Sequence, residues 1–201
     1  MLMDGDIDQS KRTTLRRFAA LGAASPLVQI AGASESDAPD ALAGYLTATP
    51  GAHFSKIRDD LELGTGETQH HLRRLEREGA VESRKDGDYR RFFPADRFSE
   101  FEQVALGYLR RETPRGMLVA LLEDHDASAS EVAARLDVSR STVSKYGSQL
   151  ESAGLLSRED GYAVENPETV LLLLVRYADS FGEGAARLAE QSPDLLEYDP
   201  E

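Results

Sequence analysis

The sequence predicts a mainly α-helical protein with small β-hairpins, built as two tandem copies of one domain followed by a C-terminal helix. The first observation is a repeat: residues around 55–79 recur at 130–154 with a constant spacing of 75 residues, from Ser55 to Ser130 and from Gly79 to Gly154. The second is that each copy shows apolar residues at helical spacing, then a glycine, then a short alternating segment. The 201 residues can bury two small cores.

In the first copy, residues 41–95, we expect helices at 41–48, 54–61 and 67–78, the last of which is closed by Gly79 as its C-cap. Residues 80–83 and 89–93 alternate as strands around Lys85-Asp86-Gly87-Asp88. The Asp-Gly pair favours a hairpin turn there.

The second copy, residues 113–166, predicts helices at 114–123, 130–136 and 141–153, with Ser130 as a helix start and Gly154 as a C-cap. Residues 155–158 and 162–164 form a shorter hairpin around Asp160-Gly161. The segment between the copies, residues 96–112, is a connecting helix over 97–111, ahead of the break at Pro114.

This order of elements is that of a winged helix-turn-helix. On the third helix of the first copy, Thr68, Leu72, Leu75 and Gly79 share the buried face, whereas Gln69, His70, Arg73 and Arg77 point outward. Arginine suits phosphates and the O6/N7 edge of guanine, and glutamine can pair with adenine. The alternative is a solvated face stabilised by Arg–Glu pairs, but the repeat and the following wing favour groove contact.

The strings ETQHHLRRLEREGAV and STVSKYGSQLESAGLL are similar to the recognition-helix region of ArsR- and MarR-like winged regulators. The double arrangement, over roughly residues 41–190, resembles archaeal and especially haloarchaeal tandem winged helix-turn-helix transcription factors. The resemblance implies a cytoplasmic transcriptional regulator that binds double-stranded DNA and is not an enzyme.

Candidate DNA contacts lie on the third helix and wing of each copy. Those of the first copy are Thr65, Glu67, Gln69, His70, Arg73, Arg74, Arg77, Arg84, Lys85, Arg90 and Arg91, and those of the second are Arg140, Ser141, Thr142, Ser144, Lys145, Tyr146, Gln149 and Arg158. Arg90 and Arg91 are adjacent in a strand, so they point to opposite faces and only one is expected to meet DNA. Gly147 stands where the first copy has Leu72, so the second copy is either looser or packed there against another surface.

The net charge of −13 opposes DNA binding, since phosphates repel an acidic protein at long range. Only four of the 23 basic residues are lysines, and the excess acid is spread along the chain, which is typical of a salt-adapted proteome. In molar salt the Debye length is about 3 Å, so distant carboxylates no longer oppose approach. A protein-interaction adaptor that does not touch DNA remains the alternative.

Other chemistry has little support. The absence of cysteine excludes disulfides, thiolate zinc sites and a cysteine nucleophile. His70 and His71 diverge on a helix, and His53 and His125 sit near loops, so no metal site is expected. No phosphate-binding glycine loop or catalytic triad motif is present. We therefore expect no catalytic activity, metal or cofactor.

Residues 1–40 are expected to be a flexible segment with weak signal or membrane character. Lys11, Arg12, Arg16 and Arg17 precede FAALGAASPLVQIAGA, which resembles a twin-arginine export signal, although the arginines run straight into Phe18. The apolar run is short for a membrane span, which needs about 20 residues. Residues 34–40 read as an acidic linker. An exported or membrane-attached protein is therefore a further alternative.

Residues 167–190 predict a C-terminal helix that is apolar all round over 170–175, followed by an acidic tail at 191–201. Such a helix must be covered on more than one side. It packs either against its own second copy alone or also against a symmetry mate. We expect a homodimer through the C-terminal and connecting helices, since paired recognition helices match a palindromic operator.

Overall fold

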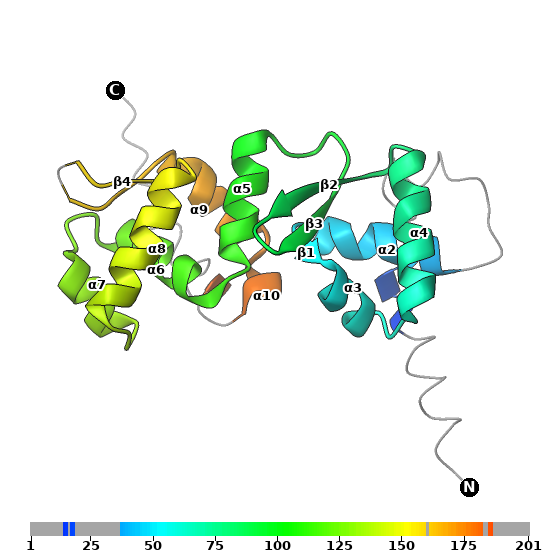
Figure 1. Cartoon of the computed structure of the whole chain (residues 1–201), viewed down its shortest axis with the longest axis horizontal. Helices are drawn as coiled ribbons and strands as arrows, with labels where there is room; N and C mark the ends of the chain where they lie inside the picture. Colours follow the sequence, from blue (N-terminus) through cyan, green and yellow to red (C-terminus); the bar gives the residue numbers. More distant parts are fainter. Residues whose placement is uncertain (1–13, 16, 19–36, 160, 183–184, 187–201) are drawn as a thin grey trace, which may run out of the picture. The chain divides into compact units, whose positions relative to one another are not determined.

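The computed structural model describes residues 14–15, 17–18, 37–159, 161–182 and 185–186. The chain divides after Ser99 into two compact units (Figure 1). Within the described residues, no helix combines the length and apolarity that a bilayer crossing requires. Each unit contains helices and one small antiparallel sheet, so the predicted fold class is confirmed.

The first unit consists of three principal helices and a three-stranded antiparallel sheet. Its elements are α2 (Asp37–Ala48), β1 (Ala52–His53), α3 (Phe54–Asp60), α4 (Thr65–Arg77), β2 (Val81–Asp86) and β3 (Tyr89–Pro94). The sheet order is β1-β3-β2. Strand β1 was not expected from the sequence, because two residues are too few to show an alternating pattern.

Helix α2 begins at Asp37, so the interpretation of residues 34–40 as a linker is wrong for 37–40. Ala38 and Ala41 are buried there, and their burial favours extending the helix toward the N-terminus. Pro39 lies in the first turn, where the missing N–H has no intrahelical partner to lose.

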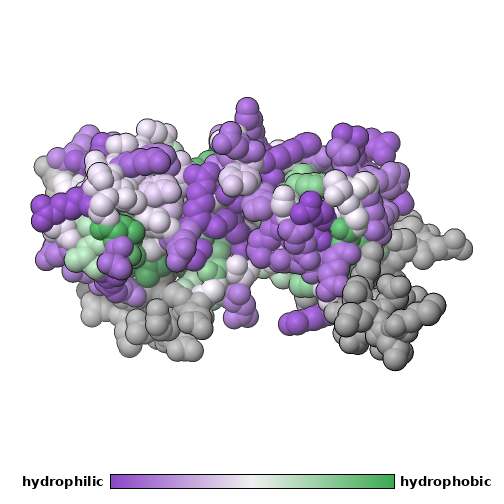
Figure 2. All heavy atoms as spheres, turned by 60° about the horizontal axis from the view of Figure 1, so that its bottom comes forward, coloured by the Kyte–Doolittle hydropathy of each residue, from purple (hydrophilic) through white to green (hydrophobic). Residues whose placement is uncertain are grey.

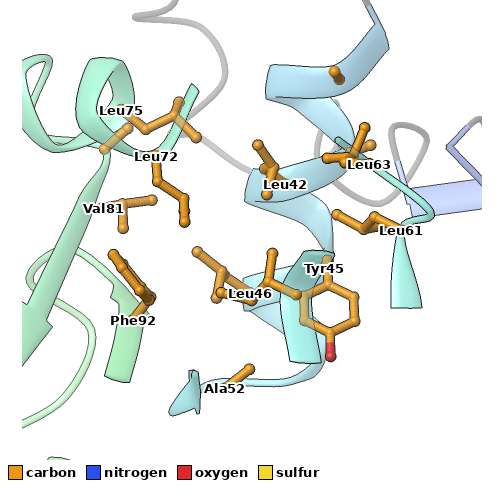
Figure 3. Packing of buried hydrophobic residues seen from close by; sticks show 14 of the residues in the cluster. Leu42, Tyr45, Leu46, Ala52, Leu61, Leu63, Leu72, Leu75, Val81 and Phe92 are labelled. Atoms are coloured by element: carbon orange, nitrogen blue, oxygen red, sulfur yellow. The ribbon is translucent and has the colours of Figure 1, made fainter. Parts of the chain in front are cut away.

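The core of the first unit forms between α2, α4 and the wing hairpin (Figure 3). Leu42 and Leu46 of α2 face Leu72 of α4 and Phe92 of β3, and all four are almost completely buried. This packing fixes the buried face of α4, and therefore also the face that it presents to solvent.

Two apolar residues of the predicted flexible segment belong to this core. Leu15 is 9% exposed, and the ring of Phe18 meets that of Tyr45 edge-on with centroids 5.2 Å apart. The described part of the apolar run therefore packs on the first unit. Arg17 is exposed, whereas Lys11, Arg12, Arg16 and residues 19–33 of the proposed signal lie outside the described residues.

The second unit repeats the plan with a smaller sheet. Its elements are α5 (Glu100–Leu109), α6 (Glu112–Glu123), α7 (Ala129–Arg135), α8 (Arg140–Ser152), β4 (Leu156–Ser157), β5 (Ala163–Val164), α9 (Pro167–Arg176) and α10 (Ala178–Phe181). Strands β4 and β5 form a two-stranded antiparallel sheet. Helix α5, the predicted connecting helix, packs against α6 and α9.

Helix α7 begins at Ala129, one residue earlier than expected, because Ser128 and not Ser130 is its N-cap. The Ser128 hydroxyl accepts from the Glu131 amide at 3.3 Å, and the Glu131 carboxylate accepts from the Ser128 amide at 2.8 Å. This reciprocal capping box satisfies two amides that the first turn of a helix leaves without partners.

The sequence repeat extends to the backbone conformation of the turn between the second and third helices of each unit. Glu62 and Asp137, 75 residues apart, are non-glycine residues in the left-handed region, at φ values of 53° and 51°. Each follows the C-terminal end of a helix. The next amide, that of Leu63 or Val138, donates back to the carbonyl five residues earlier, that of Arg58 or Ala133, in both units at 3.0 Å. These are Schellman-type ends, and they give the turn the same backbone conformation and hydrogen bond in both units.

The predicted C-terminal helix is interrupted. Helix α9 ends at Arg176, and α10 ends at Phe181 before Gly182, whose φ of 94° only glycine adopts readily. Within α9, Val170, Leu171, Leu173 and Leu174 are buried, whereas Leu172 is 61% exposed. The acidic tail at 191–201 lies outside the described residues.

Candidate nucleic-acid interface

Helix α4 presents a polar, cationic face on the side opposite its core residues. Thr68, Leu72 and Leu75 are buried, and the Thr68 hydroxyl donates to the Gly64 carbonyl at 2.9 Å. The exposed side chains on the other side are Thr65, Gln69, His70, Arg73 and Arg77. The predicted division of this helix into a buried and an outward face is the one observed, except that Gly79, which was placed on the buried face, is exposed.

A hollow of about 800 Å³ lies beside this face. It is bounded by α4 and the wing strand β3, and its lining residues are Gly66, Gln69, His70, Arg73, Glu76, Arg77 and Arg90. Three arginines and one carboxylate line it, so the local charge is positive although the whole chain is acidic. The hollow therefore suits an anionic or hydrogen-bonding ligand.

Arg77 donates from its Nε to the Arg73 carbonyl at 3.2 Å, within the helix, and it also lines the hollow. Two other predicted contacts of α4 are engaged within the helix or at its end. Glu67 accepts from the Gly64 amide at 3.3 Å and so caps the first turn. Arg74 forms an ion pair with Glu78 at 2.7 Å, and its side chain is 32% exposed. Both residues stabilise the recognition helix, and neither lines the hollow.

The wing of the first unit is a regular hairpin with Gly87-Asp88 as a two-residue turn. Strands β2 and β3 pair from Val81 opposite Pro94 to Asp86 opposite Tyr89, so Arg84 and Lys85 lie in the strand and not in the turn. Gly87 has φ of 60°, which suits glycine. Lys85 is opposite Arg90, and directly opposed residues share one face of an antiparallel pair.

Arg91 is not available to DNA. Its side chain is 3% exposed, it forms an ion pair with Asp86, and it donates to the Gly51 carbonyl at 2.9 Å. The predicted alternation of Arg90 and Arg91 therefore places Arg90 outside and Arg91 inside. The inclusion of Arg91 among the DNA contacts is corrected, because strand β1 and its preceding turn cover that side of the wing.

The second unit offers a different surface. On α8, Arg140, Ser141, Ser144 and Lys145 are exposed, whereas Thr142, Tyr146 and Gln149 are partly buried. The hydroxyl of Ser139, the N-cap, lies 2.7 Å from that of Ser141 and 2.8 Å from that of Thr142. The polar set predicted for this helix is thus concentrated at its N-terminal half.

The C-terminal half of α8 lacks the cations of α4. At the 75-residue spacing, Ser148 and Ser152 take the places of Arg73 and Arg77. Their hydroxyls donate to the helix's own carbonyls, Ser148 to Ser144 at 3.1 Å and Ser152 to Ser148 at 2.8 Å. Serine hydroxyls bonded in this way are not directed at a ligand.

Gly147 is explained by the second wing. A Cβ built on it would lie 2.7 Å from Tyr162 Cε1 and 3.1 Å from the Tyr162 hydroxyl. The tyrosine ring therefore occupies the space that the Leu72 side chain fills in the first unit. Of the two alternatives for this position, packing against another surface is the one observed, since Gly147 is buried.

The histidines serve local structure. His53 is the N-cap of α3 through its Nδ1, which accepts from the Lys56 amide at 3.3 Å, and its ring lies 4.9 Å from that of Tyr89. Burial, followed by the positive charges of Arg91 and Lys56, lowers the pKa of His53. Burial also lowers the pKa of His71. Among the described residues, no group of three or more His, Asp and Glu side chains is placed to hold a metal ion.

Sequence reasoning missed the acidic residues that hold the wings. Glu76 is bonded to Arg90 at 2.7 Å, and Glu151 is bonded to Arg158 at 2.8 Å. The signal was present, since Glu76 and Glu151 obey the 75-residue spacing, but their contacts depend on the register of hairpins that the sequence does not fix.

Comparisons with known proteins agree with this geometry. A family model described as an N-terminal HTH domain matches residues 36–106, and one described as winged helix-turn-helix DNA-binding matches residues 110–157. The fold and these matches define a chain with two tandem helix-turn-helix domains, as predicted.

The chain is also similar to a curated protein from Methanocaldococcus jannaschii that is named as an HTH-type transcriptional regulator. The two are 29% identical over 118 residues, which is 58% of this chain and 29% of the relative. The matched segment thus spans under a third of that protein's length. No solved structure matches the chain significantly.

Proposed function

We propose that this protein is a transcriptional regulator that reads duplex DNA by placing α4 in the major groove with the β2–β3 hairpin as its wing. The observation that carries the proposal is the exposed row of Gln69, Arg73 and Arg77 on α4, held beside the hollow that faces the wing. Bidentate arginine contacts to guanine and a glutamine contact to adenine are the chemistry that such a row supplies.

The two units are proposed to make different contacts with DNA. The first unit reads bases, because its exposed cations Arg73 and Arg77 lie on the C-terminal half of α4. The second unit positions the protein on the backbone through Arg140 and Lys145 at the N-terminal half of α8, where hydroxyls and helix amides also suit phosphate. The N-terminal HTH match, the winged DNA-binding match and the name of the archaeal relative support this function.

The acidic surface fits the proposal only if salt screens it. The face seen in Figure 2 is mostly hydrophilic, and the net charge is −13. We therefore propose that the regulator acts without catalysis in a cytoplasm of high ionic strength, where distant carboxylates are screened and contacts at the interface decide binding.

Assembly as a homodimer through the C-terminal and connecting helices is part of the proposal. Leu172 of α9 supports it, since a leucine that is 61% exposed between buried residues of the same helix is suited to a symmetric contact. Light scattering of Leu172→Glu should then show a monomer where the wild type is a dimer. Ala134→Glu, the same change from a neutral residue to a glutamate at an exposed position of α7, is the control and should leave the dimer intact. A wild type that is monomeric, or a Leu172→Glu variant that remains a dimer, would reject this interface.

The DNA-binding proposal is tested by sequencing genomic fragments retained by the protein, followed by titration of the enriched duplex. Arg73→Ala and Arg77→Ala should each weaken that binding by about 1–3 kcal/mol and relax the preferred sequence at one position. Arg176→Ala, the same change on α9, is the control and should leave the preference unchanged. Retention of every fragment equally, or of none at any salt concentration, contradicts the proposal.

A further inference from the structure

Three side chains join α4 to both strands of the first wing. The carboxylate Oε1 of Glu76 accepts from Arg90 Nη2 at 2.7 Å and from the Ser83 hydroxyl at 2.6 Å. Arg90 Nε donates to the same Ser83 hydroxyl at 2.8 Å. These bonds close a ring that includes the recognition helix, β2 and β3, so the wing cannot move relative to α4 without breaking charge-assisted bonds.

The second unit contains the same connection with a different partner. Glu151 of α8, 75 residues after Glu76, accepts from Arg158 Nε at 2.9 Å and from its Nη2 at 2.8 Å. Arg158 follows β4, the first strand of its wing, whereas Arg90 lies in the second strand of the other wing. Two unrelated arginine positions that meet the equivalent carboxylate indicate that the helix-to-wing connection itself has a role.

We infer that Glu76 and Arg90 form a strut that sets the distance between α4 and its wing, and that Arg90 is a positioning residue and not a phosphate contact. This inference rests on the proposed DNA-binding function of the same face. The strut holds the hollow at a fixed width, so that Gln69, Arg73 and Arg77 meet the bases in one register. Arg90 therefore governs sequence preference.

The charges around Arg90 favour this role. Its side chain is 58% exposed, but the Glu76 carboxylate that it neutralises is only 19% exposed. If Arg90 turned to a phosphate, Glu76 would remain beside the DNA backbone without its cation, and the two negative groups would repel each other. Keeping the ion pair avoids that repulsion.

The strut and a phosphate contact differ in their dependence on salt. Each phosphate neutralised by a protein cation contributes about 0.9 to the slope of log K against log salt concentration. A strut contributes nothing to that slope but changes the ratio of specific to non-specific affinity. Lys85 provides the matched cation, since it is exposed and lies opposite Arg90 on the same face of the wing.

The experiment measures fluorescence anisotropy of the full-length protein with its enriched duplex and a scrambled duplex over a range of KCl concentrations. Lys85→Ala should lower the slope by about 0.9. The double variant Glu76→Gln/Arg90→Ala removes both charges of the strut together, so it should leave the slope unchanged and reduce the specificity ratio by about fivefold. Each single variant should reduce that ratio to about the same extent.

Arg90→Lys separates the roles without loss of charge. It should behave as Arg90→Ala does in specificity, because a lysine cannot bond Glu76 and Ser83 with a fixed fork of donors. Circular dichroism of each variant verifies that it is folded. A slope reduced by the double variant Glu76→Gln/Arg90→Ala as much as by Lys85→Ala overturns the strut while leaving DNA binding intact. Failure of the wild type to bind any duplex removes the proposed function and the strut with it.

Discussion

The contact between Gly147 and Tyr162 makes a substitution whose effect reverses with its background. In the native protein, Gly147→Ala places a Cβ 2.7 Å from a tyrosine ring carbon, a distance that requires the ring to move. The helix gains about 1 kcal/mol from replacing glycine with alanine in its interior. Displacing a packed ring costs about 1–3 kcal/mol. The net effect is a loss of up to about 2 kcal/mol.

In a Tyr162→Ala background the obstruction is gone, so the same Gly147→Ala change should stabilise the second unit by about 1 kcal/mol. Urea unfolding followed by circular dichroism measures all four corners of this cycle. Gly66→Ala on α4 is the control, since a Cβ there meets nothing within 4 Å and it should not destabilise. Stabilisation by Gly147→Ala in both backgrounds would refute the assignment of Tyr162 to the place of Leu72.

Two further changes test the first wing and its neighbouring cap. Arg91→Ala removes the buried partner of Asp86 and should cost about 3 kcal/mol of unfolding free energy without altering the salt slope of DNA binding. Lys85→Ala, the exposed control, should change the unfolding free energy by less than about 0.5 kcal/mol. Equal small losses for the two variants in urea unfolding would contradict the burial of Arg91. His53 accepts a cap bond only when neutral, and its pKa in the fold is lowered, so stability is complete above the ordinary histidine pKa of about 6.5 and falls as the pH drops below it. His53→Ser copies the Ser128 cap of the second unit and should reduce the fall in unfolding free energy between about pH 7 and 5. The smaller fall that remains is the contribution of His71. An unchanged pH profile of the unfolding free energy would reject the cap.

The sequence predicted the helices well because their signals are local. Buried residues at three- and four-residue spacing and the glycines after α4 and α8 lie within single elements, and both glycines have the positive φ that ends a helix. Strand β1 and the capping of α7 by Ser128 were missed. Strand β1 depends on pairing with β3, which is distant in sequence, and no periodic pattern records that pairing. The capping box at Ser128 was readable from its spacing to Glu131.

The candidate site was predicted less completely, since exposure and pairing depend on tertiary neighbours. Alternation along β3 indicated that Arg90 and Arg91 point apart, but only the placement of Gly51 and β1 shows which of them is buried. Arg74 and Arg158 looked like DNA contacts by type, and each is bonded to a carboxylate of its own unit. The sequence does not show which carboxylate pairs with a given arginine, and that pairing decides whether the arginine can contact DNA.

The comparison of the two units separates what the repeated fold requires from what binding requires. Both keep the left-handed residue of the turn, the closing glycine and the glutamate that holds the wing, and these features bound the third helix and join it to the wing. They differ where the third helix meets solvent, with Arg73 and Arg77 on α4 and Ser148 and Ser152 on α8. Because the framework is shared and these two pairs differ, the difference supports the proposal that the first unit carries the sequence preference, and exchange of the two pairs should then transfer it.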